Sequence, residues 1–556
     1  MKERLRFFAA LSCAVLLGAC TAINSPAGEA PAAASKATAP ASWAAPQVLV
    51  PPSNFHGVHG LAVDRKGRLL AGTVTGGEMW VVDRKTGASE VFIAGPEGES
   101  DDIAIGPRGE MAWTSYLQGI IRYRRNDKAP IQELATGLPG INSLAFHPRS
   151  GKLYASQVFL GDALWEIDVR GRKKPRLIAK DMGGFNGFEV GRDGMLYGPL
   201  WFKQQVVKIH PRTGKITVIA DGFQTPAAAN LDRRGNLWVV DTKAGTLVKV
   251  HLKSRKKTVV AQLDTALDNL AIAREGTIYV SNMADNAVIA VNPKTGKATT
   301  LTSGELAVPS GSRLDGQQLL VADVFGFRSV DTQSGEVKDI YRMQASEMEY
   351  PFSVGVSSSQ VALASWFTGT VQLLDRSTKK HVSMAHGFKA PMDAIPLDDG
   401  SVLVTEIATG QVLRASGDHL KDRQVLAKDL QGPVQMVLSA DGKSVFVSEA
   451  AGRVLRVALA GGAPEVVAEK LAMPEGLAIT PWGSLLVVEA AAQRITEIDL
   501  KAKTSRTVAQ GLPIGLPALP GMPPVFAPTG VDVDADGVVY VTADRNNSVL
   551  KISPVR

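Results

Sequence analysis

The residues best suited to chemistry stand at one position of a repeated sequence unit. The first six copies of this position are His59, Asp101, Asn142, Asn186, Ala227 and Asp268. Carboxylates and amide carbonyls are hard oxygen donors, and Ca²⁺ takes about six to eight such ligands in irregular geometry. A histidine titrates near neutral pH, so His59, or His56 three residues earlier, is a candidate general base. The pattern predicts a site for Ca²⁺ or another divalent cation on Asp101, Asn142, Asn186 and Asp268.

The same position in the second half of the chain carries few groups of this kind. Its copies are Ser310, Phe352, Met392, Val434, Glu475 and Thr529. One carboxylate stands there among apolar or small residues, whereas the first half has five polar or ionisable residues. The site is therefore expected in the first half alone.

A unit of about 42 residues must position these side chains. The sequence of residues 60–70 is repeated most clearly at residues 187–197, 476–486 and 530–540. Twelve copies follow one another, with ten of the eleven intervals between 40 and 44 residues and the last of 54. Each copy holds four short apolar runs separated by Gly, Asn or Asp turns, which is typical of a four-stranded antiparallel blade. The sequence predicts an all-β fold of tandem six-bladed β-propellers, in which the recurring position surrounds one mouth of each ring.

Two rings are expected, over residues 47–304 and 305–556, with a single twelve-bladed ring as the alternative. The twelfth unit ends after three strands, whereas residues 47–50 precede the first unit as an unaccompanied strand. Residues 47–50 are predicted to complete the sixth blade, and residues 298–301 to complete the twelfth. This exchange would leave no open sheet edge.

The sequence around the fourth unit resembles a known superfamily. Residues 185–188, Phe-Asn-Gly-Phe, are similar to the Pro-Asn-Gly motif of the gluconolactonase and regucalcin superfamily, whose Asn binds calcium, and Asn142 matches a second Asn of that family. Streptogramin lyases and NHL-type propellers are more distant look-alikes. The chain departs from the pattern at His59, where the family has Glu, and at Ala227, where it has Asp. Asp268-Asn269 resembles the pair that binds catalytic calcium in paraoxonases, which adds Asn269 to the implied ligands.

The first twenty residues are typical of a bacterial lipoprotein signal. Basic residues precede an apolar run at 7–19, which is too short to span a bilayer. The run ends in Leu-Gly-Ala-Cys, which resembles a lipobox, so residues 1–19 are expected to be a signal peptide and Cys20 the lipidated residue. Residues 20–46, rich in Ala, Pro and Ser, are expected to be a flexible tether. Thr21 favours the outer membrane, so the protein is expected in the bacterial envelope, facing the periplasm or the cell surface.

Composition excludes several classes of function. The two cysteines, Cys13 and Cys20, lie in the first twenty residues, so the body has no disulfide, zinc-thiolate site or cysteine nucleophile. The net charge of +7 is mild for 556 residues, and export would keep the protein from nucleic acid. No nucleic-acid partner is expected.

Two further features have structural interpretations. Acidic residues end the second strand of several units and are expected to accept turn amides, namely Glu406, Glu449, Glu489, Asp241 and Asp323. The proline-rich loop at 512–524 accounts for the long interval, and it is expected over the second ring or between the rings.

The predicted activity is metal-dependent hydrolysis of a lactone or related ester in the first ring. A cation there would polarise the carbonyl while an imidazole activates water. The alternative is a non-enzymatic envelope scaffold that binds a protein or a glycan, and the third possibility is a lyase of a cyclic peptide lactone. The lipid anchor would make the membrane a further partner.

Overall fold

The structure, a computed structural model, describes residues 38–555. Within these residues the strands form twelve four-stranded antiparallel sheets and one two-stranded sheet. The helices of this range are short 3-10 turns, namely η1 (Trp201–Lys203), η2 (Asp418–Leu420) and η3 (Ala490–Ala492). No helix of the described part is long and apolar enough to cross a membrane.

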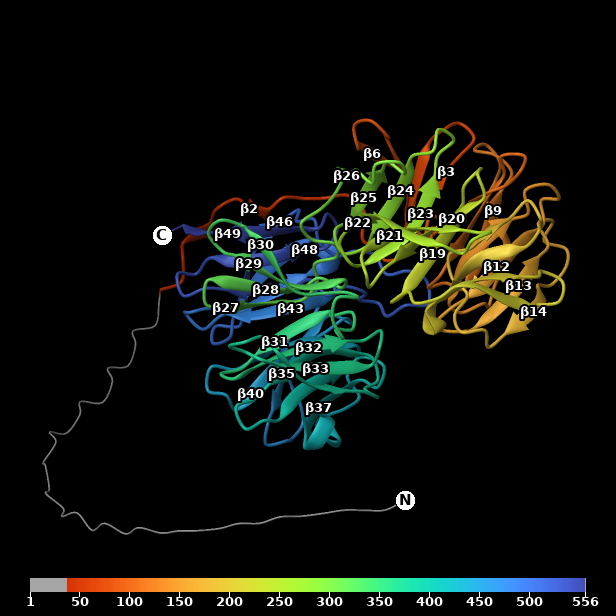
Figure 1. The fold of residues 1–556 in the computed structure, drawn as a ribbon. Helices are drawn as coiled ribbons and strands as arrows, with labels where there is room; N and C mark the ends of the chain where they lie inside the picture. The colour runs from red at the N-terminus through yellow and green to blue at the C-terminus, as the bar shows by residue number, and fades with distance from the viewer. Residues whose placement is uncertain (1–37, 556) are drawn as a thin grey trace, which may run out of the picture. The chain divides into compact units, whose positions relative to one another are not determined.

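The first six blades follow the chain from β3 to β26 (Figure 1). Blades 1 and 2 contain β3 (Val58–Val63), β4 (Leu69–Thr73), β5 (Met79–Val82), β6 (Ser89–Ile93), β7 (Ile103–Ile105), β8 (Met111–Ser115), β9 (Ile120–Arg124) and β10 (Gln132–Ala135). Blades 3 and 4 contain β11 (Ile141–Phe146), β12 (Leu153–Gln157), β13 (Ala163–Ile167), β14 (Arg176–Lys180), β15 (Glu189–Val190), β16 (Leu196–Leu200), β17 (Gln205–Ile209) and β18 (Ile216–Ala220). Blades 5 and 6 contain β19 (Pro226–Leu231), β20 (Asn236–Asp241), β21 (Thr246–His251), β22 (Lys257–Gln262), β23 (Leu267–Ile272), β24 (Ile278–Asn282), β25 (Ala287–Val291) and β26 (Ala298–Thr302). The innermost strands β3, β7, β11, β15, β19 and β23 are neighbours in this order, and β23 packs against β3 to close the first ring.

The second six blades repeat this plan. Blades 7 and 8 contain β27 (Ser312–Asp315), β28 (Gln318–Ala322), β29 (Gly326–Asp331), β30 (Val337–Arg342), β31 (Ser353–Val356), β32 (Gln360–Ser365), β33 (Thr370–Asp375) and β34 (His381–Ala385). Blades 9 and 10 contain β35 (Pro391–Pro396), β36 (Val402–Glu406), β37 (Gln411–Ser416), β38 (Asp422–Ala427), β39 (Pro433–Leu438), β40 (Ser444–Glu449), β41 (Arg453–Ala458) and β42 (Glu465–Ala468). Blades 11 and 12 contain β43 (Pro474–Ile479), β44 (Leu485–Glu489), β45 (Arg494–Asp499), β46 (Thr504–Gln510), β47 (Val531–Val533), β48 (Val539–Ala543), β49 (Ser548–Ile552) and β2 (Gln47–Val50). The strand β47 packs against β27 and closes the second ring, so the prediction of tandem six-bladed β-propellers is confirmed.

Strand β2 closes the second ring rather than the first. It pairs with β49 in an antiparallel register, while β26 stays paired with β25 in its own blade. The predicted exchange of strands between the rings is therefore wrong. The twelfth blade has three strands of its own, and β2 supplies the missing edge directly by burying Leu49 and Val50 beside Leu306 and Leu319.

The segment before β2 is partly ordered. Strand β1 (Ser42–Trp43) pairs with β50 (Pro554–Val555), and the Trp43 ring lies 5.9 Å from that of Trp482. Arg506 Nη1 donates to the carbonyl of Pro40 at 2.8 Å. The prediction of a tether running to residue 46 is wrong over residues 38–46, because their aromatic and backbone contacts hold them. Residues 1–37, with the predicted signal peptide and Cys20, lie outside the described residues.

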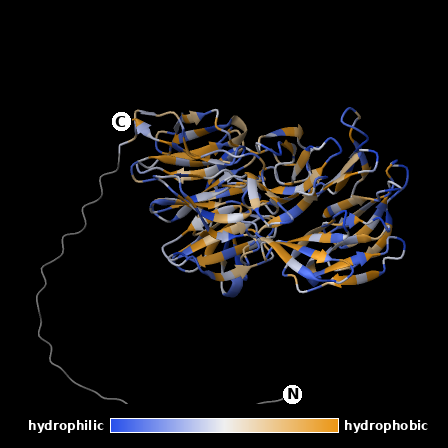
Figure 2. Cartoon of the chain, turned by 45° about the horizontal axis from the view of Figure 1, so that its top comes forward, coloured by the Kyte–Doolittle hydropathy of each residue, from blue (hydrophilic) through white to orange (hydrophobic). Residues whose placement is uncertain are grey.

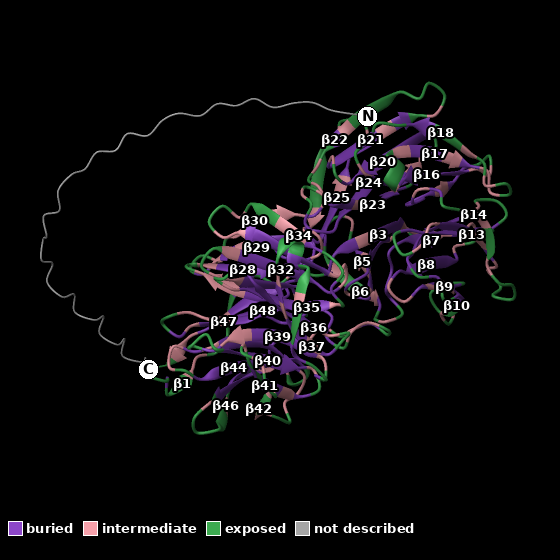
Figure 3. Ribbon diagram, turned by 90° about the horizontal axis from the view of Figure 1, so that it is seen from below, coloured by how far each residue is buried: buried purple, intermediate pink, exposed green. Residues whose placement is uncertain are grey.

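Local sequence explains why each unit folds as a blade. After β19, Asp232 Oδ1 accepts the amides of Arg234 and Asn236, and Gly235 takes the left-handed backbone (φ 79°) that the turn requires. Hydrophobic residues run along the strands, and hydrophilic ones gather at the connections (Figure 2). Inner strands such as β11 are wholly buried, whereas outer strands such as β14 are largely exposed (Figure 3). The hydrophobic core of each ring therefore lies between neighbouring blades, where one blade packs on the next.

The capping carboxylates behave as expected. Glu406, Glu449 and Glu489 each accept a backbone amide from the loop that leads into the innermost strand of the same blade, and Asp241 and Asp323 do likewise. The loop at 512–524 lies between the rings, also as expected. Its Leu519 is buried against Gly77 of the first ring, so closely that a Cβ atom on Gly77 would lie 2.7 Å from Leu519 Cδ2.

Candidate functional site

The polar copies of the recurring position line one cavity. His59 lies in β3, Asn142 in β11 and Asp268 in β23, while Asp101 and Asn186 stand just before β7 and β15. Each residue stands where an innermost strand begins, so ring closure brings the five together. They line one end of a cavity of about 400 Å³. The remaining copy, Ala227, is buried in β19 and does not line it.

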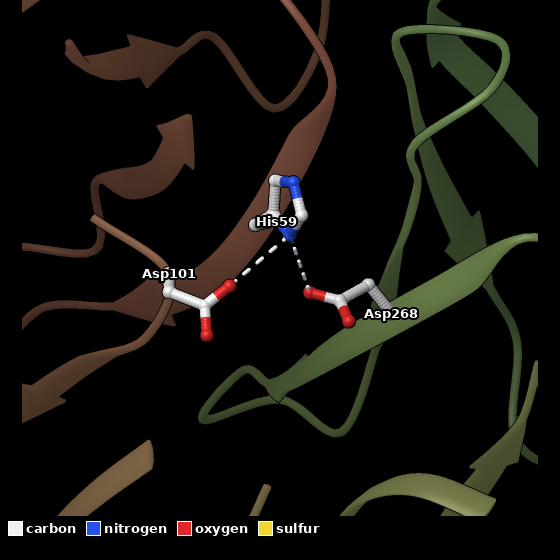
Figure 4. A group of neighbouring side chains, drawn as sticks. All are labelled: His59, Asp101 and Asp268. Atoms are coloured by element: carbon white, nitrogen blue, oxygen red, sulfur yellow. Dashed lines mark ion pairs between the residues drawn. The ribbon is translucent and has the colours of Figure 1, made fainter. Parts of the chain in front are cut away.

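His59 sits between two carboxylates at the polar end of this cavity. Its Nδ1 lies 3.1 Å from Asp101 Oδ1 and 3.3 Å from Asp268 Oδ2 (Figure 4). Neither contact has the alignment of a regular hydrogen bond, and both ring nitrogens are buried without a hydrogen-bond partner among the described residues. One ligand atom from each of the three side chains lies within 4.8 Å of the others, a spacing that could hold a metal ion.

The two carboxylates keep His59 protonated. Burial by itself disfavours the charged ring, but the hydrogen-bonding capacity and negative charges of Asp101 and Asp268 outweigh it and raise the pKa of His59 to about 10. Burial raises the pKa of Asp101 to about 6, with His59 opposing the rise and Asp268 adding to it. An imidazolium has no lone pair that can accept a proton. In this state His59 is therefore not the general base that the sequence predicted.

Ser143 joins the two asparagines of the site. Its Oγ lies 2.7 Å from Asn142 Oδ1 and 2.9 Å from Asn186 Oδ1, and it accepts the amide of Gly187 at 2.8 Å. Asn186 Oδ1 also accepts the amide of Gly187 at 2.9 Å. A single hydroxyl proton can serve one amide oxygen at a time, so the amide oxygen of Asn142 is the more available of the two for a ligand. Ser143 was not among the predicted site residues. Nothing in the sequence singled it out, because the position that follows the recurring one varies in the first ring, with Gly60, Asp102, Ser143, Gly187, Ala228 and Asn269.

Asn269 does not belong to the cavity. Its Nδ2 donates to Asp102 Oδ1 at 3.0 Å, and its Oδ1 accepts the amide of Leu270 at 2.7 Å. Asp102 Oδ2 in turn accepts the amide of Leu144 at 3.1 Å. These bonds tie blade 6 to blades 2 and 3 behind the mouth. Asn269 does not line the cavity, and its amide oxygen already accepts a backbone hydrogen bond. The predicted role as a metal ligand is therefore wrong for this residue.

His56 lies at the contact between the rings. Its Nε2 is 2.8 Å from the carbonyl oxygen of Asp544 in the second ring, and the residue does not line the cavity. Burial lowers the pKa of His56 to about 4, although the bond to Asp544 opposes the shift. His56 therefore links the rings, and the prediction that it is an alternative base at the first mouth is wrong.

Half of the remaining lining of the cavity comes from the second ring, which was not expected from the sequence. Eight residues of that ring line the cavity, and five of them are aromatic, namely Phe325, Tyr350, Phe352, Phe367 and Phe526. Only Phe352 stands at the recurring position. The other aromatic residues lie in loops on the same edge of the blades, where a single sequence gives no sign that the two mouths face one cavity.

Comparisons with known proteins add little to this geometry. No protein-family model matches the sequence, and no curated protein matches it. Among solved structures, a streptogramin B lyase matches with 14% sequence identity and a TM-score of 0.26, over 59% of this chain and 93% of that one. A similarity of this size carries no inference about this chain, so the propeller fold rests on the strand pairing described above.

The site can hold a cation and a small molecule together. Asp101, Asp268 and His59 Nδ1 offer two oxygens and one nitrogen, and the Asn142 and Asn186 amides stand beside them. The carboxylates are the strongest of these ligands, because the amide oxygens already contact Ser143. The rest of the cavity is largely apolar and would keep water away from the polar end.

Proposed function

We propose that the mouth of the first ring is a small-molecule site that hydrolyses a lactone or related ester with the help of a divalent cation. The observation that carries this proposal is the cluster of His59, Asp101 and Asp268 at the polar end of the cavity. The resemblance of residues 185–188 to a calcium-binding motif of lactonases supports the same reaction class.

The side chains present fit a divalent cation. Two carboxylate oxygens and an imidazole nitrogen lie within 4.8 Å of one another. A cation bound at His59 Nδ1 would displace the proton that the two carboxylates otherwise hold on the ring, because a ligating imidazole must be neutral. A mixed nitrogen and oxygen set suits Zn²⁺, Mn²⁺ or Fe²⁺ better than Ca²⁺, which prefers oxygen alone. The proposal therefore shifts from the calcium expected from sequence towards a first-row transition metal.

Each group of residues in the cavity would have its own role in the reaction. Asp101, Asp268 and His59 Nδ1 would hold the cation, which when bound supplies a Lewis acid for the substrate carbonyl. Asn142 and Asn186, oriented by Ser143, would bind the ester oxygens by hydrogen bonds. His59 Nε2, buried without a partner among the described residues, would hold a proton for the substrate. Hydrolysis consumes one water molecule, which the cation when bound would activate, and the aromatic wall would exclude the rest of the bulk water.

A turnover assay tests this function. The full chain is purified, stripped with chelator, reloaded with Zn²⁺, Mn²⁺ or Ca²⁺, and assayed on a panel of lactones and aryl esters. We expect hydrolysis that chelator abolishes, and a loss of at least about 100-fold in Asp268→Asn. Glu475→Gln, a buried carboxylate at the second mouth, is the matched control and should keep the wild-type rate. Hydrolysis that survives in chelator, or no hydrolysis with any metal, would reject the proposal.

The second candidate is a binding module without turnover. His59 held as an imidazolium between two carboxylates favours it, because a protonated ring has no lone pair with which to act as a base. Ligand binding without hydrolysis in the same panel would support this candidate, as a scaffold for a small molecule, a protein or a glycan.

We also propose that the chain is exported and anchored to the bacterial envelope through lipid on Cys20. The support is the basic start, the apolar run and the lipobox-like ending in residues 1–20. Metabolic labelling with a clickable fatty acid should mark the wild type and fail to mark Cys20→Ser. An unlabelled wild type in its native bacterium would reject the anchor.

A further inference from the structure

The cavity is fixed because the two rings are joined beside it. Arg342 of the second ring forms an ion pair with Asp285 of the first, with Nη1 donating to Oδ1 at 2.6 Å, and both side chains are little exposed. His56 of the first ring contacts the carbonyl of Asp544 in the second at 2.8 Å. The loops of the second ring are thereby held opposite the polar mouth of the first.

The second ring's wall is a set of interlocked aromatic rings. Tyr350 packs edge-on against Phe325 at 6.1 Å and against Phe367 at 5.3 Å between ring centroids. Phe325 reaches across to His59 at 5.7 Å, and Phe352 packs edge-on against Phe526 at 6.0 Å. Edge-to-face pairs of this kind hold each other in place. The wall is thus preformed for a flat or branched apolar group.

The charges around the cavity are unfavourable for an anion. The charged residues that line it are His59, Asp101 and Asp268, and no Lys or Arg of the described chain is among its lining residues. Asp101 and Asp268 lie within 3.3 Å of His59 Nδ1, so two acidic side chains flank the one basic side chain of the lining.

An apolar rim leads from the cavity to the surface. Phe159 and Leu160, on the loop after β12, line the cavity and are 48% and 54% exposed. The Phe159 ring packs edge-on against Trp201 at 5.2 Å and Phe202 at 5.7 Å. Phe159 is held in the left-handed backbone region (φ 68°), which a bulky side chain rarely adopts. Exposed aromatic groups next to an apolar cavity mark an entry path for a ligand of the same character.

We infer that the ligand is a neutral amphipathic small molecule, with a polar carbonyl end at His59, Asp101 and Asp268 and an apolar, aromatic-sized body against the second ring. The second ring is then the specificity domain of a site whose charged side chains, His59, Asp101 and Asp268, all belong to the first. This inference rests on the proposed function in taking the same cavity as the ligand site. It names the substrate class as apolar lactones or esters, not polyhydroxylated or anionic ones.

Binding in chelator tests the inference without turnover. The neutral probe N-phenyl-1-naphthylamine and its anionic counterpart 8-anilinonaphthalene-1-sulfonate are titrated into the metal-free full chain, with fluorescence as the readout. We expect the neutral probe to bind at least about tenfold more tightly, because two carboxylates and no Lys or Arg of the described chain face it. Phe367→Ala should weaken the neutral probe about fivefold or more. Phe92→Ala, a half-buried aromatic residue on the outer strand β6, is the matched control and should bind as the wild type does.

Two results would overturn the inference. One is equal affinity for the neutral and anionic probes, and the other is equal affinity in Phe367→Ala and Phe92→Ala when circular dichroism shows both variants folded. If Phe367→Ala fails to fold, Phe367→Leu replaces it and should weaken the probe by a smaller factor. Probe binding without any hydrolysis would reject the proposed function and keep this inference. Hydrolysis of short and long esters at equal kcat/KM, without probe binding, would do the reverse.

Discussion

The mouths of the two rings are built from the same strand position and differ in what they hold. In the first ring this position brings His59, Asp101 and Asp268 together as an ion cluster. In the second ring, three of the six copies, Phe352, Met392 and Val434, belong to one buried hydrophobic cluster, and the other three are the buried Ser310, Glu475 and Thr529. The blades fold alike in both rings, so the fold does not require the polar groups of the first. A polar mouth kept beside an apolar one indicates function rather than architecture.

The carboxyl groups of the two mouths make the same contrast. Glu475 of the second ring is buried, and its Oε2 accepts the amide of Thr529 at 2.7 Å. Burial and the nearby Asp544 raise the pKa of Glu475 to about 8, so it is largely neutral at pH 7. Asp101 and Asp268 instead face an imidazolium. The carboxylates of the first mouth therefore lie beside a cationic ring, whereas the carboxyl group of Glu475 lies near another carboxyl group, that of Asp544.

Removing β2 should have the largest effect on stability, and the loss of stability should be confined to the second ring. Deleting residues 38–50 exposes the edge of β49 and removes the buried Leu49 and Val50, at a cost of about 3–6 kcal/mol in the free energy of unfolding. Hydrogen exchange should show lost protection in β47, β48 and β49, with β25 and β26 unchanged. Deleting only residues 38–45, which keeps β2, is the control. Loss of protection in β25 instead would show that β2 pairs with the first ring and would contradict this account.

The next largest effect should come from adding one negative charge to each mouth, because the cost in stability should differ between the two. Val434→Asp places an unpaired carboxylate in the hydrophobic cluster of the second mouth, and we expect a loss of about 3–5 kcal/mol in the free energy of unfolding. Asn142→Asp adds the same charge where the first cavity is polar, and should cost clearly less. Urea unfolding of both variants measures the difference. Equal losses would mean that the two mouths are equally apolar.

The contact between the rings should weaken in acid through His56. Because burial lowers the pKa of His56 from 6.5 to about 4, the folded chain binds fewer protons than the unfolded chain between these values. The stability is present in full above pH 6.5 and falls as the pH drops to 4, by about 3 kcal/mol. Subtracting the profile of His56→Gln, which keeps an amide donor, isolates this effect from other groups. Wild-type and variant profiles of the same slope would contradict it.

The smallest expected effect is at Ser143. Ser143→Ala removes the hydroxyl that joins Asn142 to Asn186, at a cost of about 1 kcal/mol in the free energy of unfolding. Reloaded enzyme should also lose turnover more than affinity, because the amides lose their orientation. Ser448→Ala, which removes another buried and hydrogen-bonded hydroxyl, in the second ring, is the control for stability alone. A fall in turnover of equal size in both variants would assign Ser143 a structural role only.

The sequence predicted the blades well because each blade is encoded locally. The spacing of Gly turns and apolar runs within one unit specifies four strands. The polar residues at the recurring position indicated the mouth of the ring at which His59 and Asp268 meet. Long-range contacts were harder. The choice of β49 as the partner of β2 and the second ring's aromatic wall depend on how distant loops meet. The protonation of His59 depends on two carboxylates from other blades, so the residue type alone predicted the wrong role.

Anomalous diffraction from crystals of the full chain grown with Zn²⁺ or Mn²⁺ is the most direct test of a cation at the first mouth. We expect one strong peak there, within about 2.0–2.3 Å of His59 Nδ1 and of oxygens from Asp101 and Asp268. Crystals of Asp268→Asn should lose that peak, and crystals of Glu475→Gln should keep it. A first mouth without a peak, or a peak at Glu475 and Asp544 in the second ring, would show that the polar mouth is not the cation site.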